Sequence, residues 1–126
     1  MAAGAVDVTV KAAPDEVWAK VGDFGGVAEF FPGIDSFRLE GDERVIGMFG
    51  MEIRERLLAR DEESRTLTYS VVAGVPIESH TATISVQPEG EGSRIIWAYD
   101  VTPDEMAPVF GDTYQAALVA LEGLFS

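Results

Sequence analysis

Residues 80–125, HTATISVQPEGEGSRIIWAYDVTPDEMAPVFGDTYQAALVALEGLF, decide the fold of this chain. Apolar and polar side chains alternate over residues 80–86 and again over 94–101, on either side of a Gly-rich turn at 88–93. Alternation with a period of two is typical of strands in a sheet that is buried on one face. The residues expected on the buried face are His80, Ala82, Ile84, Val86, Ile95, Trp97, Tyr99 and Val101.

The segment after these strands predicts a long amphipathic helix. Thr102-Pro103-Asp104-Glu105 has the form of a capping box with Pro at the first helical position. Pro108 either kinks this helix or marks its true start after a short capped turn. We expect the helix to pack on the apolar face of the sheet, with a cavity between them if the sheet is curved. Its apolar residues recur at helical spacing and are Met106, Phe110, Tyr114, Ala117, Leu118, Leu121 and Phe125.

The remaining sequence predicts five more strands and one or two short helices. Because the connections between the strands are short, we expect an antiparallel sheet. The seven expected strands are 6–10, 36–41, 43–49, 51–60, 65–72, 77–87 and 93–101. Pro14-Asp15-Glu16 is typical of a first helical turn, and Gly25-Gly26 should end that helix. A second helical piece is expected over 27–31, and Trp18 should pack the first helix against the sheet.

Composition limits the classes of function. The chain has 126 residues, enough for a single domain, 1–126. Its net charge of −13 repels phosphate backbones and anionic lipid headgroups, so we expect neither nucleic-acid binding nor membrane insertion. The absence of Cys excludes disulfides and thiolate metal sites. The start of the sequence has no signal-peptide pattern, which predicts a cytoplasmic protein.

Several short stretches of this sequence follow a common family pattern. They are Ala13-Pro14-Asp15-Glu16-Val17-Trp18, Phe30-Phe31-Pro32-Gly33-Ile34, Arg54-Glu55-Arg56-Leu57-Leu58, Leu67-Thr68-Tyr69, Ala82-Thr83-Ile84 and Gly92-Ser93-Arg94-Ile95-Ile96-Trp97. In these stretches the sequence resembles the START-like or helix-grip superfamily (SRPBCC), and within it the polyketide cyclase/dehydrase and lipid-transport group. The resemblance covers nearly the whole chain. One departure is Gly47-Met48-Phe49-Gly50-Met51, which joins two strands without the usual polar turn and leaves their register open.

The resemblance implies an α+β helix-grip fold. In that fold a curved seven-stranded antiparallel sheet wraps around a long C-terminal helix, with one or two short helices after the first strand. Members of the superfamily enclose an apolar cavity, and they include lipid carriers, hormone receptors and polyketide cyclases. A single START-like ligand-binding domain is therefore expected.

Strand alternation predicts which side chains line this cavity. Within 51–60, Glu55 falls on the inner face, while Arg54, Arg56 and Arg60 fall on the outer, solvated face. Phe30-Phe31-Pro32-Gly33 either forms a lid over the cavity or is a plain turn. Four aromatic side chains either line the cavity or are ordinary core residues, and one residue can do both, because the cavity wall is also the core. They are Trp97, Tyr99, Phe110 and Tyr114. The expected ligand-binding residues are Phe31, Glu55, Tyr69, His80, Trp97, Tyr99, Phe110 and Tyr114.

A carboxylate inside an apolar cavity must be neutral, paired or near an opening, because burying it alone costs several kcal/mol. His80 and Tyr69 are the expected partners of Glu55. The cluster would either orient a ligand or supply acid and base groups for a cyclisation, or it is a structural contact that closes one end of the sheet. Close pairing with ionised Glu55 predicts a raised pKa for His80.

No sequence motif of metal, nucleotide or acyl-transfer chemistry is present, so we expect no cofactor and no metal. The first functional hypothesis is the binding or transport of a small hydrophobic, lipid-like or polyketide-like ligand. The alternative is a cyclase or dehydratase that uses Glu55, His80 and Tyr69. The third is a regulatory interaction protein with a vestigial pocket. Part of the apolar stripe on the last helix could also serve a homodimer contact.

Overall fold

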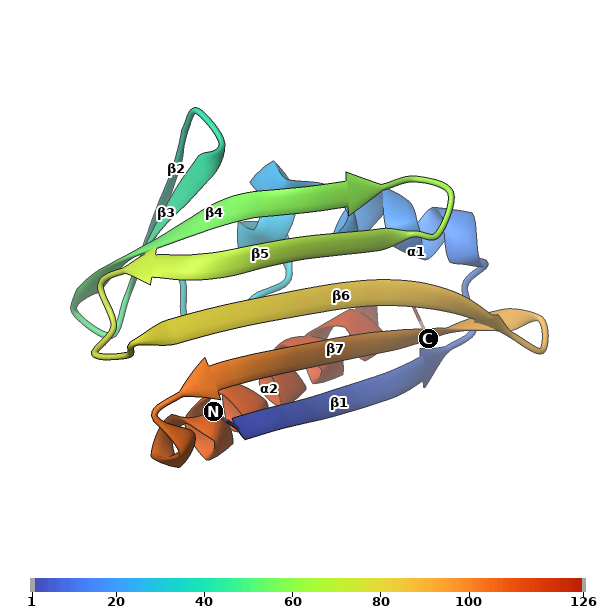
Figure 1. The fold of residues 1–126 in the computed structure, drawn as a ribbon. Helices are drawn as coiled ribbons and strands as arrows, with labels where there is room; N and C mark the ends of the chain where they lie inside the picture. The colour runs from blue at the N-terminus through green and yellow to red at the C-terminus, as the bar shows by residue number, and fades with distance from the viewer. Residues whose placement is uncertain (1, 126) are drawn as a thin grey trace.

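The computed structural model describes residues 2–125, which form one seven-stranded antiparallel sheet with helices on its inner face (Figure 1). The strand order is β1-β7-β6-β5-β4-β3-β2, so β1 and β2 are the edge strands. This confirms the fold that the sequence predicted. The strands are β1 (Ala2–Val10), β2 (Ser36–Glu40), β3 (Glu43–Met48), β4 (Met51–Asp61), β5 (Thr66–Ala73), β6 (Ser79–Glu89) and β7 (Gly92–Thr102).

The long C-terminal helix α2 (Ala107–Phe125) lies across β1 and β7, behind these strands in Figure 1. Tyr114, Leu118 and Leu121 on its inner face are almost completely buried. Because α2 sits over one side of the sheet, the inner face of β3, β4 and β5 is left for other side chains to cover. That asymmetry gives the molecule room for a cavity beside the helix.

The short helices differ in detail from the expected ones. Helix α1 (Pro14–Val21) begins at Pro14 as predicted, and Trp18 is buried in the core, but the helix ends at Val21, before the Gly25-Gly26 pair that was expected to end it. The second piece is a 3-10 helix, η1 (Phe24–Glu29), and not a helix over 27–31. The Asp23 side chain accepts a hydrogen bond from Gly25 N–H, so an aspartate cap starts the turn and the glycine pair lies inside it.

The predicted capping box before α2 is wrong. Thr102 is the last residue of β7, and the next turn is a short 3-10 helix, η2 (Asp104–Met106), without a side-chain cap. Helix α2 then starts at Ala107, so Pro108 lies in its first turn. Of the two alternatives, Pro108 therefore marks the start of the helix.

A register shift in β4 overturns the expected position of Arg60. The shift lies between Leu57 and Ala59, and after it Arg60 pairs with the buried Leu67 of β5. An extra residue in one strand reverses which face later side chains occupy. Arg60 consequently lies on the inner side with α1, where its guanidinium stacks on Trp18 at 5.2 Å and its Nε donates to the Gly22 carbonyl.

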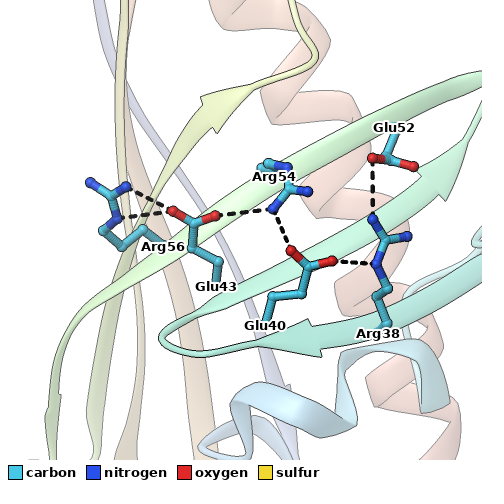
Figure 2. A network of polar contacts seen from close by, with 6 residues as sticks. All are labelled: Arg38, Glu40, Glu43, Glu52, Arg54 and Arg56. Atoms are coloured by element: carbon cyan, nitrogen blue, oxygen red, sulfur yellow. Dashed lines mark hydrogen bonds and ion pairs between the residues drawn. The ribbon is translucent and has the colours of Figure 1, made fainter.

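Arg54 and Arg56 do lie on the outer face, in a network of ion pairs across β2, β3 and β4 (Figure 2). Arg54 bridges Glu40 and Glu43, and hydrogen bonds from Arg56 and Arg54 lower the pKa of Glu43. Val45 lies beneath this network, because Arg38 and Arg54 are its two neighbours in register. The network also places charges along the edge strand β2, which discourages pairing with other chains.

The β3–β4 hairpin is compact. Met48 pairs with Met51, and the two residues between them, Phe49 and Gly50, both have positive φ (53° and 73°). Positive φ at both central positions is the pattern of a type I′ turn, in which Asn-Gly is the preferred pair. Phe49 is an unfavourable choice there on two counts, since it is bulky at positive φ and its side chain is 72% exposed.

Replacing Phe49 with Asn is therefore expected to stabilise the fold by about 1 kcal/mol, because Asn tolerates this backbone conformation. The matched control is Phe49→Ala, which removes the same ring but leaves a residue disfavoured at positive φ. Urea unfolding of both variants checks the prediction. Equal stability of the two would show that the turn carries no backbone strain.

Candidate functional site

The candidate site is a cavity of about 100 Å³ between the inner face of the sheet and the N-terminal half of α2. A buried water molecule needs a cavity volume of roughly 10–15 Å³, so this cavity has room for several water molecules. Its walls are formed by the β3–β4 hairpin, the inner faces of β4 and β5, η2 with the start of α2, and the loops that carry Phe31 and Val75. The lining residues are Phe31, Met48, Phe49, Met51, Ile53, Glu55, Val71, Val75, Met106, Val109, Phe110, Thr113 and Tyr114.

A buried ion pair lies at this cavity. Arg44 Nε donates to Glu55 Oε1 at 2.7 Å, and both residues are at least nine-tenths buried. The Arg44 guanidinium also donates to the Phe24 carbonyl at 3.1 Å and lies over the rings of Phe24 and Tyr69. Charge pairing and cation–π contacts thus compensate the burial of the guanidinium.

The hairpin register brings these two residues together. With Met48 opposite Met51, Arg44 stands directly opposite Glu55 on the inner face. Glu55 lies on the inner face as predicted, whereas the inward position of Arg44 was not predicted. Strand alternation groups Arg44 with Ile46 and Met48, which indicates an inward position, but its pairing with Glu55 depends on the register of the hairpin.

His80 does not pair with Glu55, contrary to the prediction. Its Nδ1 accepts a hydrogen bond from Val71 N–H at 3.0 Å, and its Nε2 lies 2.8 Å from the Tyr114 hydroxyl. A ring nitrogen that accepts carries no proton, so the neutral ring holds its proton on Nε2 and donates it to Tyr114. Burial lowers the pKa of His80 from 6.5 to about 4, the opposite of the predicted direction.

The position of His80 follows from a break in the β5–β6 ladder. Backbone pairing between these strands extends only to Tyr69 and Ala82, and beyond that point the strands separate. The His80 side chain then takes the hydrogen bond of Val71 N–H, and Ser70 Oγ donates to the His80 carbonyl. An outer groove of about 390 Å³ occupies the gap, and His80 forms part of its wall.

Aromatic rings pack behind the cavity. Trp97 stacks on Tyr114 with ring centroids 4.4 Å apart, and Phe31 and Trp97 are in T-shaped contact with centroids 5.9 Å apart. Trp97 Nε1 donates to the Tyr69 hydroxyl at 3.1 Å. Burial raises the pKa of both Tyr69 and Tyr114, and the charge of Glu55 raises them further. Both phenols are therefore neutral at ordinary pH.

Tyr99 acts as a spacer at the other side of this layer. Its hydroxyl would lie 2.4 Å from a Cβ added to Gly4 of β1 and 2.5 Å from one added to Gly111 of α2. The two glycines leave the space that the tyrosine hydroxyl occupies. Tyr99 contacts Tyr114 edge-on and stands outside the cavity lining.

The structure thus divides the eight predicted ligand-binding residues into two groups. Phe31, Glu55, Phe110 and Tyr114 line the cavity. Tyr69, Trp97, Tyr99 and His80 lie in the layer that supports these side chains. The rim of the cavity, formed by Phe49, Met51 and Val109, was not predicted, because strand alternation does not extend to the tip of a hairpin or the start of a helix.

Within residues 2–125, no three His, Asp or Glu side chains are grouped as metal ligands would be. Across the same residues, no helix has the length and apolar character needed to span a membrane.

A bent antiparallel sheet holding a C-terminal helix beside an internal cavity defines a helix-grip domain of the START-like superfamily. The chain belongs to the polyketide cyclase/dehydrase and lipid-transport family, whose model matches residues 1–125.

Solved structures agree with this assignment. XoxI from Bacillus cereus is similar to this chain with 29% identity and a TM-score of 0.93, over 99% of this chain and 96% of that one. A protein from Thermobifida fusca is 31% identical with a TM-score of 0.85, over 97% and 91% of the two chains. Major latex-like protein 151 from Panax ginseng, at 18% identity and a TM-score of 0.79 over 98% and 97%, shares the fold. Among curated proteins, none matches this sequence.

Proposed function

We propose that this protein binds a small hydrophobic ligand in the cavity between the sheet and α2. The observation that carries the proposal is the composition of the cavity wall, which is apolar except for Glu55 and the hydroxyls of Thr113 and Tyr114. Concave apolar sites with a few polar groups are typical of small-molecule binding. The description of the family, which includes lipid transport, supports the same function.

The cavity volume restricts the size of the ligand. About 100 Å³ is below the roughly 300–1,000 Å³ of sites that hold drug-sized molecules. The ligand is therefore short, or the rim side chains move outward when it enters. Phe49 and Val109 are 72% and 52% exposed and can move without disturbing the core. An exposed aromatic residue at the rim also offers a first apolar contact to an arriving ligand.

Binding is better supported than a cyclase or dehydratase reaction. Of the three groups considered as acid and base, Glu55 alone lines the cavity. The His80 ring is held between Val71 N–H and the Tyr114 hydroxyl, and the Tyr69 hydroxyl accepts from Trp97. Proton transfer to a ligand requires a group within hydrogen-bond reach of it.

The test is a fluorescence titration with N-phenyl-1-naphthylamine, an uncharged apolar probe. We expect saturable binding at one site per chain, and at least tenfold weaker binding by Thr113→Trp, whose indole would fill the cavity. Gln115→Trp is the matched control, because Gln115 is exposed on the same helix. Absence of probe binding to the wild type would favour the third hypothesis, a protein with a vestigial pocket. Equal affinity of the two variants for the probe would show that the probe binds outside this cavity.

A further inference from the structure

The cavity wall presents a carboxylate and not the guanidinium that balances it. Among the described residues that line the cavity, Glu55 is the charged one, and Arg44 is absent from the lining. Arg44 lies behind Glu55, with its donors directed to Glu55 Oε1 and the Phe24 carbonyl and with aromatic rings around its guanidinium. Of the hydroxyls in the wall, Thr113 Oγ1 donates to the Val109 carbonyl at 2.7 Å, and the Tyr114 hydroxyl is hydrogen-bonded to His80 and Tyr69. A ligand that reaches the polar part of the wall therefore meets the Glu55 carboxylate and the Thr113 oxygen as hydrogen-bond acceptors.

The electrostatics of this pair restrict the charge of a ligand head. Arg44 already neutralises Glu55, so a cationic head would lose its hydration without finding an unpaired anion. An anionic head would bring a second negative charge next to Glu55 in a poorly solvated site. The net charge of −13 opposes anions at long range as well. An uncharged donor, such as a hydroxyl or an amide N–H, avoids both costs.

We propose, on the basis of the proposed function, that the ligand is an apolar molecule with an uncharged hydrogen-bond-donating head that binds Glu55. The cavity accordingly selects alcohols, phenols or amides and rejects carboxylates and ammonium groups of the same size. The Arg44–Glu55 pair is then the specificity determinant of the site, and Glu55 is its contact residue.

The test compares 1-octanol, octanamide, octanoate and octylammonium at pH 7 as competitors of N-phenyl-1-naphthylamine. The four molecules share one chain length and differ in the head. For the wild type we expect the alcohol and the amide to bind at least tenfold more tightly than the two ions. Similar affinities for octanol and octanoate would overturn the proposal, as would failure of all four to displace a bound probe. Failure of the probe itself to bind would instead refute the proposed function.

The variant Glu55→Gln sharpens the test. It leaves the charge of Arg44 unbalanced beside the cavity, so octanoate should gain at least tenfold relative to octanol. Glu52→Gln is the matched control, because Glu52 lies on the same strand, pairs with Arg38 on the outer face and is not part of the cavity lining. An unchanged ratio in a folded Glu55→Gln protein would contradict the proposal. If that variant does not fold, the affinities of the wild type for the four competitors still test the proposal.

Discussion

Replacing Arg44 with Met should lower the free energy of unfolding by about 3–5 kcal/mol, the largest effect expected of any single substitution considered for this protein. The change leaves Glu55 buried without its positive partner, and the Phe24 carbonyl loses its donor. Met has a similar length and fills most of the same space, so the lost charge and not a cavity dominates the effect. Urea unfolding at pH 7 measures it.

A double-mutant cycle separates the interaction between Arg44 and Glu55 from the contacts that each residue makes with its other neighbours. Arg44→Met combined with Glu55→Leu should recover most of the lost stability, because no charge is then left buried. The control is Arg56→Met, since Arg56 pairs with Glu43 on the solvent-exposed face and its loss should have little effect. If Arg44→Met and Arg56→Met cost the same, the Arg44–Glu55 pair is not buried as described.

The second prediction concerns pH. His80 is the only histidine of the chain, so its ring signals can be assigned without ambiguity. In the folded protein its pKa is lowered to about 4 by burial, whereas the unfolded chain has the ordinary value of 6.5. Between these values the unfolded state binds the additional proton, and stability must therefore fall as the pH falls. The difference of about 2.5 pKa units corresponds to about 3 kcal/mol lost between pH 6.5 and pH 4.

Two measurements check this prediction. Proton NMR of the His80 ring should show no titration near pH 6.5, and the nitrogen shifts should identify the tautomer protonated on Nε2. The stability difference between the wild type and His80→Asn should shrink by about 3 kcal/mol from pH 7 to pH 4, because the carboxylates titrate in both proteins. A ring that titrates near 6.5 would contradict the buried hydrogen bonds to Val71 and Tyr114.

Much of the site could be predicted from the sequence. Alternation over a strand places Glu55, Tyr69, His80 and Trp97 on the inner face, and helical spacing places Tyr114 opposite them. These assignments depend only on the period of the local structure. They hold because one face of the sheet is buried and a slip of one residue would expose it.

The contacts among these inner residues could not be predicted in the same way. Alternation tells which face a side chain occupies but not which neighbour it meets. The Arg44–Glu55 pair depends on the register of the β3–β4 hairpin, which follows from the Phe49-Gly50 turn. Arg60 lies on the inner side, and not on the predicted outer face, because of an irregularity in β4 that no pattern in the sequence indicated.

By itself, the sequence determined the seven strands, the helix that packs on them and the side chains that face inward, because the periods of two and 3.6 are properties of the local backbone. The tertiary structure alone decided the partners of the buried polar groups. Strand separation placed the His80 ring against Val71 N–H and Tyr114, and hairpin register placed Arg44 against Glu55. The physical reason is that buried polar groups must be satisfied by whatever lies within about 3 Å, and only the packed chain sets that distance.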